Sequence, residues 1–513
     1  MEQIGILLTG SLIIGAAGCS SSDKSGSEES SRPNIIFIMA DDLGYGDVSC
    51  YNPDSKIQTP NMDLMASQGK IFLDAHTPSA VCTPTRYGVL TGRYPWRSEL
   101  KQGVLWGYSA PLITPERLTI ASMLKQADYN TAVVGKWHLG LDWSFTVEDE
   151  SLKNAKDYVK VGNSVDFNQP FSGGPLDLGF DYFYGMAASW DMPPYVWLEN
   201  DKACVLPTEI TKEMGRKGHA SPGMKPEHAL PELTKKSVEL IHQYSNQDSP
   251  FFLYFPLPSP HDPIAPNDEF IGTSEAGEYG DFVVETDWVL GQIIQALDEA
   301  GISENTLLIF TSDNGPERHM IKRKTEYNHY SSGILKGCKR DNWEGGHRVP
   351  FLAKWPGKIE AGSKSHEVIS LVDMIATFSD IAKTTIPQKY AEDSYSILSE
   401  LNGTNNDSPI REATIHASSS GRFAIRKGDW KLMMHLGSGG NKYELTDSSE
   451  IQLFNLKDDL SEEYNLHKEN PQIVNELKAL LEKYIVEGRS TPGPDLQNDT
   501  AGKWPQIEWI NNK

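Results

Sequence analysis

Four short apolar runs, each followed within a few residues by polar side chains, constrain the fold of this chain more than any other feature. The runs span residues 35–39, 132–134, 251–255 and 307–311. Runs of this length are typical of the buried strands of an α/β sheet. Because such sheets place their ligand sites at the carboxyl ends of the strands, we expect the polar residues to meet in one crevice. In chain order they are Asp41, Asp42, Lys136, His138, His261, Asp313 and Asn314.

Helix-like segments lie between these runs. They span residues 60–68, 118–127, 233–244 and 279–300, and the last has apolar residues at helical spacing. Alternating strand and helix segments favour an α/β fold with a mainly parallel sheet flanked by helices. We assign residues 33–402 to this part of the chain.

After residue 402 the pattern changes to short strands without long helices between them. The polar stretch 403–407 precedes strand-like residues 423–426 and 430–434, which flank a turn at Gly428 and Asp429. Another short strand follows at residues 453–456, and residues 471–487 form a closing helix. We therefore expect a smaller C-terminal α+β subdomain over residues 403–513.

The charge of the chain limits its partners. Its 513 residues carry a formal net charge of -23, whereas proteins that bind nucleic acid use an excess of Lys and Arg to neutralise phosphates. We therefore exclude nucleic acid as a partner, and an anionic ligand would need a local basic pocket. The five cysteines are widely spaced and none lies in a CxxC pattern, so they predict neither a disulfide framework nor a zinc ribbon.

The first residues resemble a bacterial lipoprotein signal peptide. An apolar run at residues 4–14 is followed by small residues and then by Cys19. We predict a signal peptide at residues 1–18, a lipid anchor on Cys19 and a polar, flexible tether at residues 19–32. This places the protein in the bacterial cell envelope, either in the periplasm or as an outer-membrane lipoprotein that is attached to the membrane through the lipid.

The pentapeptide Cys82-Thr83-Pro84-Thr85-Arg86 leads into a helix-like run. A helix start presents free N–H groups and positive charge, so a side chain there can meet an anion. Taken alone, the stretch is equally a buried cysteine beside a proline turn. It resembles the C-x-P-S/T-R signature of type I sulfatases, in which a maturase oxidises the cysteine to formylglycine (3-oxoalanine).

Two further segments strengthen this resemblance. Residues 129–138 are similar to the second signature of the family, which ends in G-K-W-H. Residues 335–339 and 343–350 resemble its L-R-G-x-K and W-E-G-G-x-R-x-P segments. The resemblance extends from about residue 33 to residue 356, and it implies the alkaline-phosphatase-like fold for residues 33–402.

Three carboxylates and one amide supply a set of oxygen ligands, which suits Ca²⁺ or Mg²⁺ better than zinc. These residues are Asp41, Asp42, Asp313 and Asn314. In the family they hold a single Ca²⁺ that also contacts the modified Cys82. The alternative for each pair alone is that its side chains cap helices that follow strands.

The resemblance also implies the catalytic roles. The hydrate of the modified Cys82 attacks sulfur, and Arg86 and Lys136 hold that hydrate. Lys136 and Lys339 face the sulfate oxygens, where negative charge must be accommodated.

Two histidines complete the implied cycle. His261, with Lys339, protonates the departing oxygen, and His138 removes a proton from the second hydroxyl so that sulfate leaves. A single Lys or His near a strand end is more often an ion-pair or packing residue than a catalyst, so the assignment depends on the convergence of these side chains.

We expect a sulfuric ester hydrolase whose substrate is a sulfated carbohydrate, because the form of residues 336–356 and of the pentapeptide is most similar to glycan sulfatases of gut or marine bacteria. The expected substrate is a 6-sulfated galactose or N-acetylgalactosamine residue, from which the enzyme releases sulfate by exo action. Candidate substrate contacts follow or lie near the strand-end motifs: Trp143, Trp190, Asp191, Arg318, His319 and His347.

Three alternatives stay open. One is an arylsulfatase of broad specificity. A second is a phosphatase or phosphodiesterase of the same superfamily, which would need a second metal cluster where Lys136, His138 and Lys339 stand. A third is a non-catalytic glycan-binding lipoprotein, which has no need of Cys82.

Overall fold

A ten-stranded sheet forms the centre of the molecule, and its five central strands are parallel neighbours. The computed structural model describes residues 1–2, 32–149, 151–152, 156–405, 408–444, 448–500 and 504–511. The central strands, in spatial order, are β11 (Thr306–Ser312), β1 (Asn34–Ala40), β10 (Phe251–Pro256), β4 (Asn130–Lys136) and β5 (Tyr182–Met186). Four of the five contain the apolar runs of the sequence, so that part of the prediction is confirmed.

Shorter strands extend this sheet at both sides. Beyond β11 lie β12 (Phe351–Lys354), β2 (Lys70–Phe72) and β13 (Ser363–Ser365), and the β11–β12 and β12–β2 pairs are antiparallel. Beyond β5 lie β6 (Leu198–Glu199) and β7 (Lys202–Ala203), which are also antiparallel. The sheet is therefore mixed at its edges and parallel where the polar strand ends meet.

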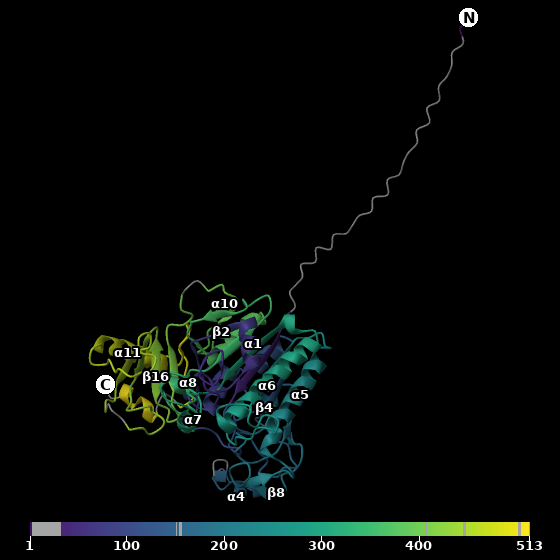
Figure 1. The fold of residues 1–513 in the computed structure, drawn as a ribbon, viewed down its shortest axis with the longest axis horizontal. Helices are drawn as coiled ribbons and strands as arrows, with labels where there is room; N and C mark the ends of the chain where they lie inside the picture. The colour runs from purple at the N-terminus through teal and green to yellow at the C-terminus, as the bar shows by residue number, and fades with distance from the viewer. Residues whose placement is uncertain are drawn as a thin grey trace. The chain divides into compact units, whose positions relative to one another are not determined.

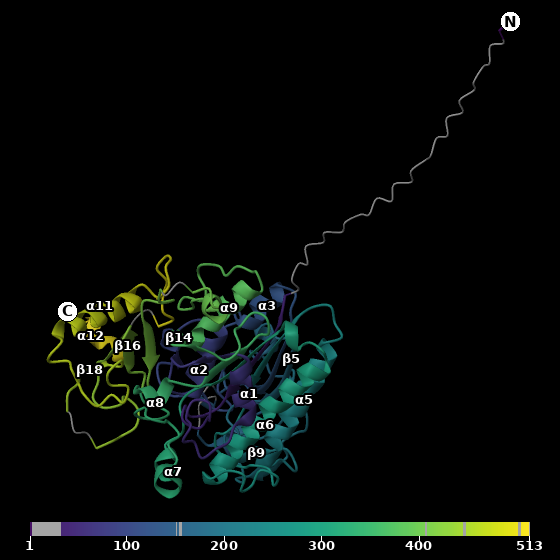
Figure 2. The same cartoon turned by 45° about the horizontal axis from the view of Figure 1, so that its top comes forward.

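Helices cover both faces of the sheet (Figures 1 and 2). Successive side chains of a strand point to opposite faces, and accordingly Ile36 and Ile38 lie in one core cluster while Ile35 and Phe37 lie in another. The first face is covered by α1 (Pro60–Gln68), α5 (Ala229–Tyr244) and α6 (Gly277–Glu299). The second is covered by α2 (Cys82–Thr91), α3 (Ile120–Gln126) and α9 (Met374–Ile381). The predicted α/β class is confirmed.

The predicted helices differ from the observed ones mainly at their starts. α3 begins at Ile120 because Thr119 and Ser122 form a capping box there. α5 begins four residues before the predicted start, at Ala229. Among the described residues, none of the helices combines the length and the hydrophobicity of a membrane-spanning segment.

A four-stranded antiparallel sheet and a helix form the C-terminal part. The strands, in spatial order, are β15 (Thr414–Ala417), β16 (Phe423–Lys427), β17 (Trp430–Met433) and β18 (Gln452–Asn455), and α11 (Pro471–Val486) packs on them. Strand β15 was not predicted. Its Ala417 forms a β-bridge with Ser79, just before α2, and residues Arg32–Lys513 form one compact unit.

The predicted signal peptide and tether lie outside the described residues, apart from Met1, Glu2 and Arg32. Cys19 is among the residues that are not described.

Candidate active site

A cluster of oxygen ligands forms where β1 and β11 end side by side. Ala40 pairs with Ser312 in the parallel ladder, so the residues that follow them are neighbours. The Asn314 Nδ2 donates to Asp42 Oδ1 at 2.7 Å, and the backbone N–H of Asp42 donates to Asp313 Oδ1 at 3.3 Å. Asp41, Asp42, Asp313 and Asn314 are all at most 1% exposed. The four predicted metal ligands are thus brought together.

This cluster fits a hard cation. Oδ1 of Asp41 and Oδ1 of Asn314 are buried without a hydrogen-bond partner, which is costly for an acceptor unless something binds it. Burial raises the pKa of Asp313 above its ordinary value, and so does the negative charge of Asp41, because two carboxylates this close repel each other. A divalent cation ligated by oxygen would satisfy the orphaned atoms and relieve this repulsion.

Cys82 lies beside the cluster, at the first residue of α2. Its sulfur and one carboxylate oxygen each of Asp41 and Asp313 lie within 4.8 Å of one another. Burial raises the pKa of the Cys82 thiol, even though Lys136 and Lys339 act in the opposite direction. As an unmodified side chain, Cys82 is therefore a protonated thiol and a poor nucleophile at neutral pH.

Three buried cations surround the oxygen cluster, and each pairs with a different carboxylate. Arg86 donates to Asp313 Oδ2 from Nη2 at 2.6 Å and from Nε at 3.1 Å. Lys136 Nζ lies 2.5 Å from Asp41 Oδ2, and Lys339 Nζ lies 2.7 Å from Asp42 Oδ1. Three positive charges balance three negative ones. A bound divalent cation would make the crevice positive, as an anionic ligand requires in a chain of net charge -23.

His138 follows β4 and has an unpaired ring nitrogen. Its Nε2 lies 2.9 Å from the carbonyl oxygen of Leu105, and because a carbonyl only accepts, Nε2 carries the hydrogen. Its Nδ1 is buried without a partner. Burial, Lys136 and Arg86 lower the pKa of His138 well below its usual value. His138 is therefore a neutral imidazole with a free lone pair on Nδ1, which is the state of a proton acceptor.

His261 follows β10 and faces the same cluster. Its Nδ1 lies 2.7 Å from the carbonyl oxygen of Asp262, so this nitrogen donates. Its Nε2 lies 3.7 Å from Asp42 Oδ2. Nε2 of His261 therefore lies near the Asp42 carboxylate, with which Lys339 Nζ also pairs.

A cavity of about 420 Å³ opens over Cys82. Cys82, His261 and Lys339 contribute to its wall, together with two of the predicted substrate contacts, Asp191 and His319. The other lining residues were not predicted: Val81, Gly103, Val104, Trp106, Met192, Arg216, Asp262, Glu317, Arg340 and Ser419.

Two arginines of this wall are held by acids. Arg340 makes two hydrogen bonds to Glu317, at 2.6 and 2.8 Å. Arg216 pairs with Asp191, and its guanidinium lies over the Trp106 ring at 5.2 Å from the centroid. Arg340 directly follows the predicted catalytic residue Lys339 in the sequence, and this adjacency could have identified it as a residue of the cavity wall. Arg216 lies just before β9 (Gly218–Ala220), away from any strand-end motif, so no sequence signal identified it.

The other four predicted substrate contacts do not line this cavity. Trp143 packs against Phe171 in the core and Trp190 packs against Trp197. The exposed Arg318 lies over the ring of a tyrosine of the C-terminal part, and His347 is buried among other histidines. Sequence proximity to a motif does not fix the direction of a side chain, and these four point elsewhere.

A second cavity of about 780 Å³ adjoins the first. It lies between the start of α6 and α7 (Met320–Tyr327). Asp262, Glu317 and His319 line both cavities, so the second cavity lies next to the one over Cys82.

Comparisons with known proteins agree with this geometry. The sulfatase family matches residues 33–384, and the family described as N-sulphoglucosamine sulphohydrolase, C-terminal, matches residues 338–487. An N-acetylgalactosamine-6-O-sulfatase from Bacteroides thetaiotaomicron is 34% identical, over 91% of this chain and 96% of the relative. Human arylsulfatase A is 32% identical, over 90% of each chain.

A solved structure gives the same result. It is reported for the metabolism of multiple glycosaminoglycans by Bacteroides thetaiotaomicron, and it is 33% identical with a TM-score of 0.76, covering 88% of this chain and 99% of the other. The family resemblance of the sequence is thus confirmed. This chain belongs to the sulfatase family, with the alkaline-phosphatase-like fold, and it is a sulfuric ester hydrolase.

Proposed function

We propose that this enzyme hydrolyses the sulfate ester of a carbohydrate, with 6-sulfated N-acetylgalactosamine or galactose as the sugar. The observation that carries the proposal is the placement of Cys82 between a cluster of buried oxygen ligands and a cavity large enough for a small ligand. The choice of sugar is supported by the bacterial relative named N-acetylgalactosamine-6-O-sulfatase, which this chain matches over nearly its whole length.

The nucleophile in this proposal is Cys82 after conversion to formylglycine by a maturase. The hydrated aldehyde supplies a hydroxyl that can attack sulfur. Support comes from the state of the unmodified residue, since a buried thiol with a raised pKa is a weak nucleophile. The position at the start of α2 also directs backbone N–H groups toward an anion.

Asp41, Asp42, Asp313 and Asn314 would hold one Ca²⁺, which supplies positive charge next to the nucleophile and the sulfate. The orphaned oxygens of Asp41 and Asn314 support this assignment. The oxygen-only ligand set also favours a hard cation over zinc.

The cations of the chain would hold the sulfate group. Lys339 lines the cavity and Lys136 lies behind it, so their ammonium groups can stabilise the charge that develops on the sulfate oxygens. Arg86 would act indirectly, because its guanidinium donates to Asp313 and to the Lys136 carbonyl oxygen. It holds these groups in place.

The two histidines would move protons. His261 lines the cavity, and we assign it to protonation of the departing sugar oxygen. His138 has a neutral ring with a free Nδ1, and we assign it to removal of a proton from the nucleophile when sulfate is released. Thr83, next to Cys82, donates to the backbone carbonyl of His138 at 3.0 Å and keeps the two segments together.

The sugar would be bound by the polar wall opposite Cys82. Asp191, Arg216 and His319 offer hydrogen-bonding groups, and Trp106 offers an aromatic face. The adjoining cavity gives room for further sugar residues beyond the sulfated one. The two neighbouring cavities support a glycan as the substrate.

We further propose that the protein is anchored in the bacterial cell envelope through a lipid on Cys19. The proposal depends on the signal-like sequence of residues 1–18. Metabolic labelling with a radioactive fatty acid tests it, and loss of the label in Cys19→Ser would support it.

The phosphatase alternative is disfavoured by the site. Lys136 and Lys339 each pair with a carboxylate of the oxygen cluster, and they supply positive charge from the protein where a second metal ion would lie in that alternative.

The experiment that tests the main proposal uses protein produced together with a maturase and a panel of defined sulfated sugars. Release of sulfate from a 6-sulfated N-acetylgalactosamine or galactose compound supports it. Activity on aryl sulfates alone, or a preference for phosphodiesters, contradicts it.

A further inference from the structure

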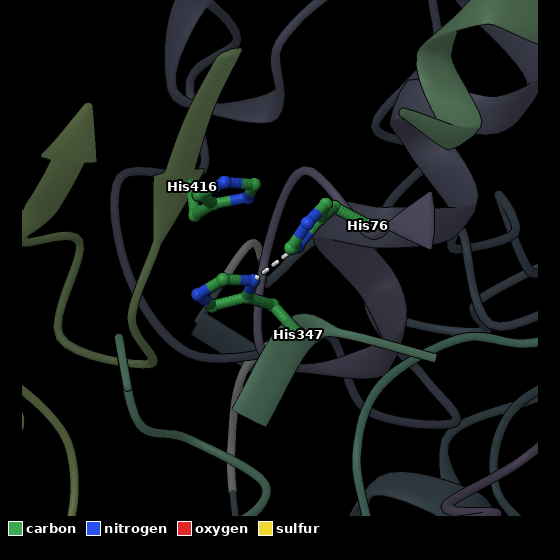
Figure 3. Close-up of side chains that lie close together, drawn as sticks. All are labelled: His76, His347 and His416. Atoms are coloured by element: carbon green, nitrogen blue, oxygen red, sulfur yellow. Dashed lines mark hydrogen bonds between the residues drawn. The ribbon is translucent and has the colours of Figure 1, made fainter. Parts of the chain in front are cut away.

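A cluster of three buried histidines lies outside the catalytic cavity, at the junction with the C-terminal sheet. His76 ends β3 (Ala75–His76), His347 ends α8 (Glu344–His347), and His416 lies in β15. All three side chains are 0% exposed. Figure 3 shows the rings gathered from these three segments, and one ring nitrogen of each lies within 4.8 Å of those of the other two.

The outer nitrogen of each ring is bound to an acceptor. Carboxylate and carbonyl oxygens only accept, so these contacts favour the tautomer in which each outer nitrogen carries the hydrogen. Two donors also lie near these nitrogens: Arg426 Nη1 is 3.2 Å from His76 Nε2, and Lys431 Nζ is 3.1 Å from His347 Nε2. In the favoured tautomer, the other nitrogen of each ring has a free lone pair. The outer contacts are His76 Nε2 to Asp74 Oδ1 at 2.6 Å, His347 Nε2 to the Asn342 carbonyl oxygen at 3.0 Å and His416 Nδ1 to the Thr77 carbonyl oxygen at 3.1 Å.

The inner nitrogens need a cation. Nδ1 of His76 and Nδ1 of His347 lie 3.0 Å apart, along the dashed line of Figure 3. With both outer nitrogens protonated, two lone pairs face each other at that distance and repel, whereas a hydrogen on either Nδ1 makes this contact an N–H···N hydrogen bond. Nε2 of His416 is buried without a hydrogen-bond partner. A proton between His76 and His347 would leave His416 unsatisfied, whereas a metal ion satisfies all three.

We propose that His76, His347 and His416 form a second metal site, which binds a divalent transition-metal ion, with Zn²⁺ the best match to three imidazole nitrogens. Histidine ligands of metals usually donate their other N–H to a carboxylate or a backbone carbonyl, as all three do here. The rings of His347 and His416 are stacked, with 7° between their planes. One of these two rings therefore rotates when the ion binds, because a lone pair lies in the plane of its ring.

The charges around the cluster are balanced. Lys431 Nζ lies 3.1 Å from His347 Nε2, but its ammonium pairs with Glu344 and Glu462, each at 2.9 Å. The ion therefore does not enter a pocket of net positive charge. The neighbouring acids are Asp74, Glu344 and Glu462, and the neighbouring bases are Arg348, Arg426 and Lys431.

The function of this site is structural. Its ligands come from the main part of the chain and from the C-terminal sheet, so the ion would crosslink the two. Because none of the three histidines lines the cavity over Cys82, the ion would stabilise the fold without taking part in sulfate transfer. The site and its nitrogen ligands are also distinct from the oxygen cluster proposed for Ca²⁺.

Metal analysis of the full-length protein tests this proposal. The protein is purified without chelators, equilibrated with zinc buffered by a weak chelator, and measured by inductively coupled plasma mass spectrometry. We expect one zinc ion per chain, and we expect Co²⁺ to give the visible absorption of a four-coordinate nitrogen site. A wild-type protein with neither signal overturns the proposal and leaves a shared proton as the explanation for the His76–His347 contact.

His416→Asn is the informative variant. The asparagine amide can still donate to the Thr77 carbonyl, but it lacks the inner nitrogen. We expect zinc content to fall from one ion to nearly none and the zinc-dependent rise in melting temperature to disappear. His329→Asn removes an equally buried histidine that pairs with Asp47 elsewhere, and we expect it to retain the ion. Equal zinc in wild type and His416→Asn contradicts the assignment, whatever the stability of the variant.

Discussion

Replacing Arg86 by methionine tests the electrostatic balance of the site. Arg86 and Asp313 are both 0% exposed, and two hydrogen bonds join them. Removing one partner of a buried pair leaves an uncompensated charge, which costs about 3–5 kcal/mol. Asp313 also lies near Asp41, whose negative charge already raises its pKa. We therefore expect Arg86→Met to lower the free energy of unfolding by about 3–5 kcal/mol when Ca²⁺ is removed by a chelator.

Urea denaturation followed by circular dichroism measures this change. Arg340→Met is the matched control, because the Arg340 side chain pairs equally closely with Glu317 but is 38% exposed. Its loss should cost about 1 kcal/mol or less. In the double variant Arg86→Met/Asp313→Asn the buried charge is gone, so its cost should be smaller than the sum of the two single costs. Equal effects of Arg86→Met and Arg340→Met, or strict additivity in the double variant, would refute the reasoning.

Three further predictions concern the bound cation, Lys339 and the buried carboxyl of Glu285. Chelation of Ca²⁺ should lower the melting temperature of the wild type, because the protein loses about 2.7 kcal/mol of stability if the free ion had been at 100 times its dissociation constant. Asp313→Asn should abolish most of that response in a thermal-shift assay. An unchanged response in this variant would contradict a cation at Asp313. Lys339→Ala should lower kcat/KM for a sulfated sugar by about 10²-fold or more, whereas Lys322→Ala, on the rim of the second cavity, should change it far less, and equal losses would contradict the role of Lys339. Burial raises the pKa of Glu285 to about 7, so the folded state binds the proton more tightly than the unfolded state, and stability falls as the pH rises from about 4.5 to 7. Glu285→Gln should flatten this part of the plot of stability against pH. A variant with the same pH dependence as the wild type would show that Glu285 is not its cause.

The strands of the central sheet could be predicted because burial on both faces produces continuous apolar runs. The runs that became β1, β4, β10 and β11 also gave the location of the crevice, since the polar residues after them meet at one edge. Strand β15 was missed because its four residues contain one histidine and no long apolar run.

The oxygen cluster and its cations could be inferred because each member directly follows a strand or belongs to a long motif. The wall of the cavity could not be inferred in the same way. Arg216 reaches the cavity from a separate hairpin, and its position depends on contacts with Asp191 and Trp106. Trp143 and Trp190 lie near the motifs in sequence, but their rings are large apolar surfaces that pack into the cores.

The histidine cluster was also beyond sequence reasoning. His76, His347 and His416 lie at least 69 positions apart in the chain, and none of them shows a metal-ligand spacing. Their outer hydrogen bonds, which suggest the direction of each lone pair, involve backbone carbonyls and Asp74. The contact between His416 and Thr77 exists only once the C-terminal sheet has packed on the rest of the chain.

The most direct measurement is mass spectrometry of the peptide that contains Cys82, combined with sulfate release by the same protein sample. The account predicts an aldehyde at Cys82 in protein produced with a maturase, and hydrolysis of sulfated sugar in proportion to the converted fraction. Full sulfatase activity in a sample whose Cys82 is entirely an unmodified thiol would contradict it.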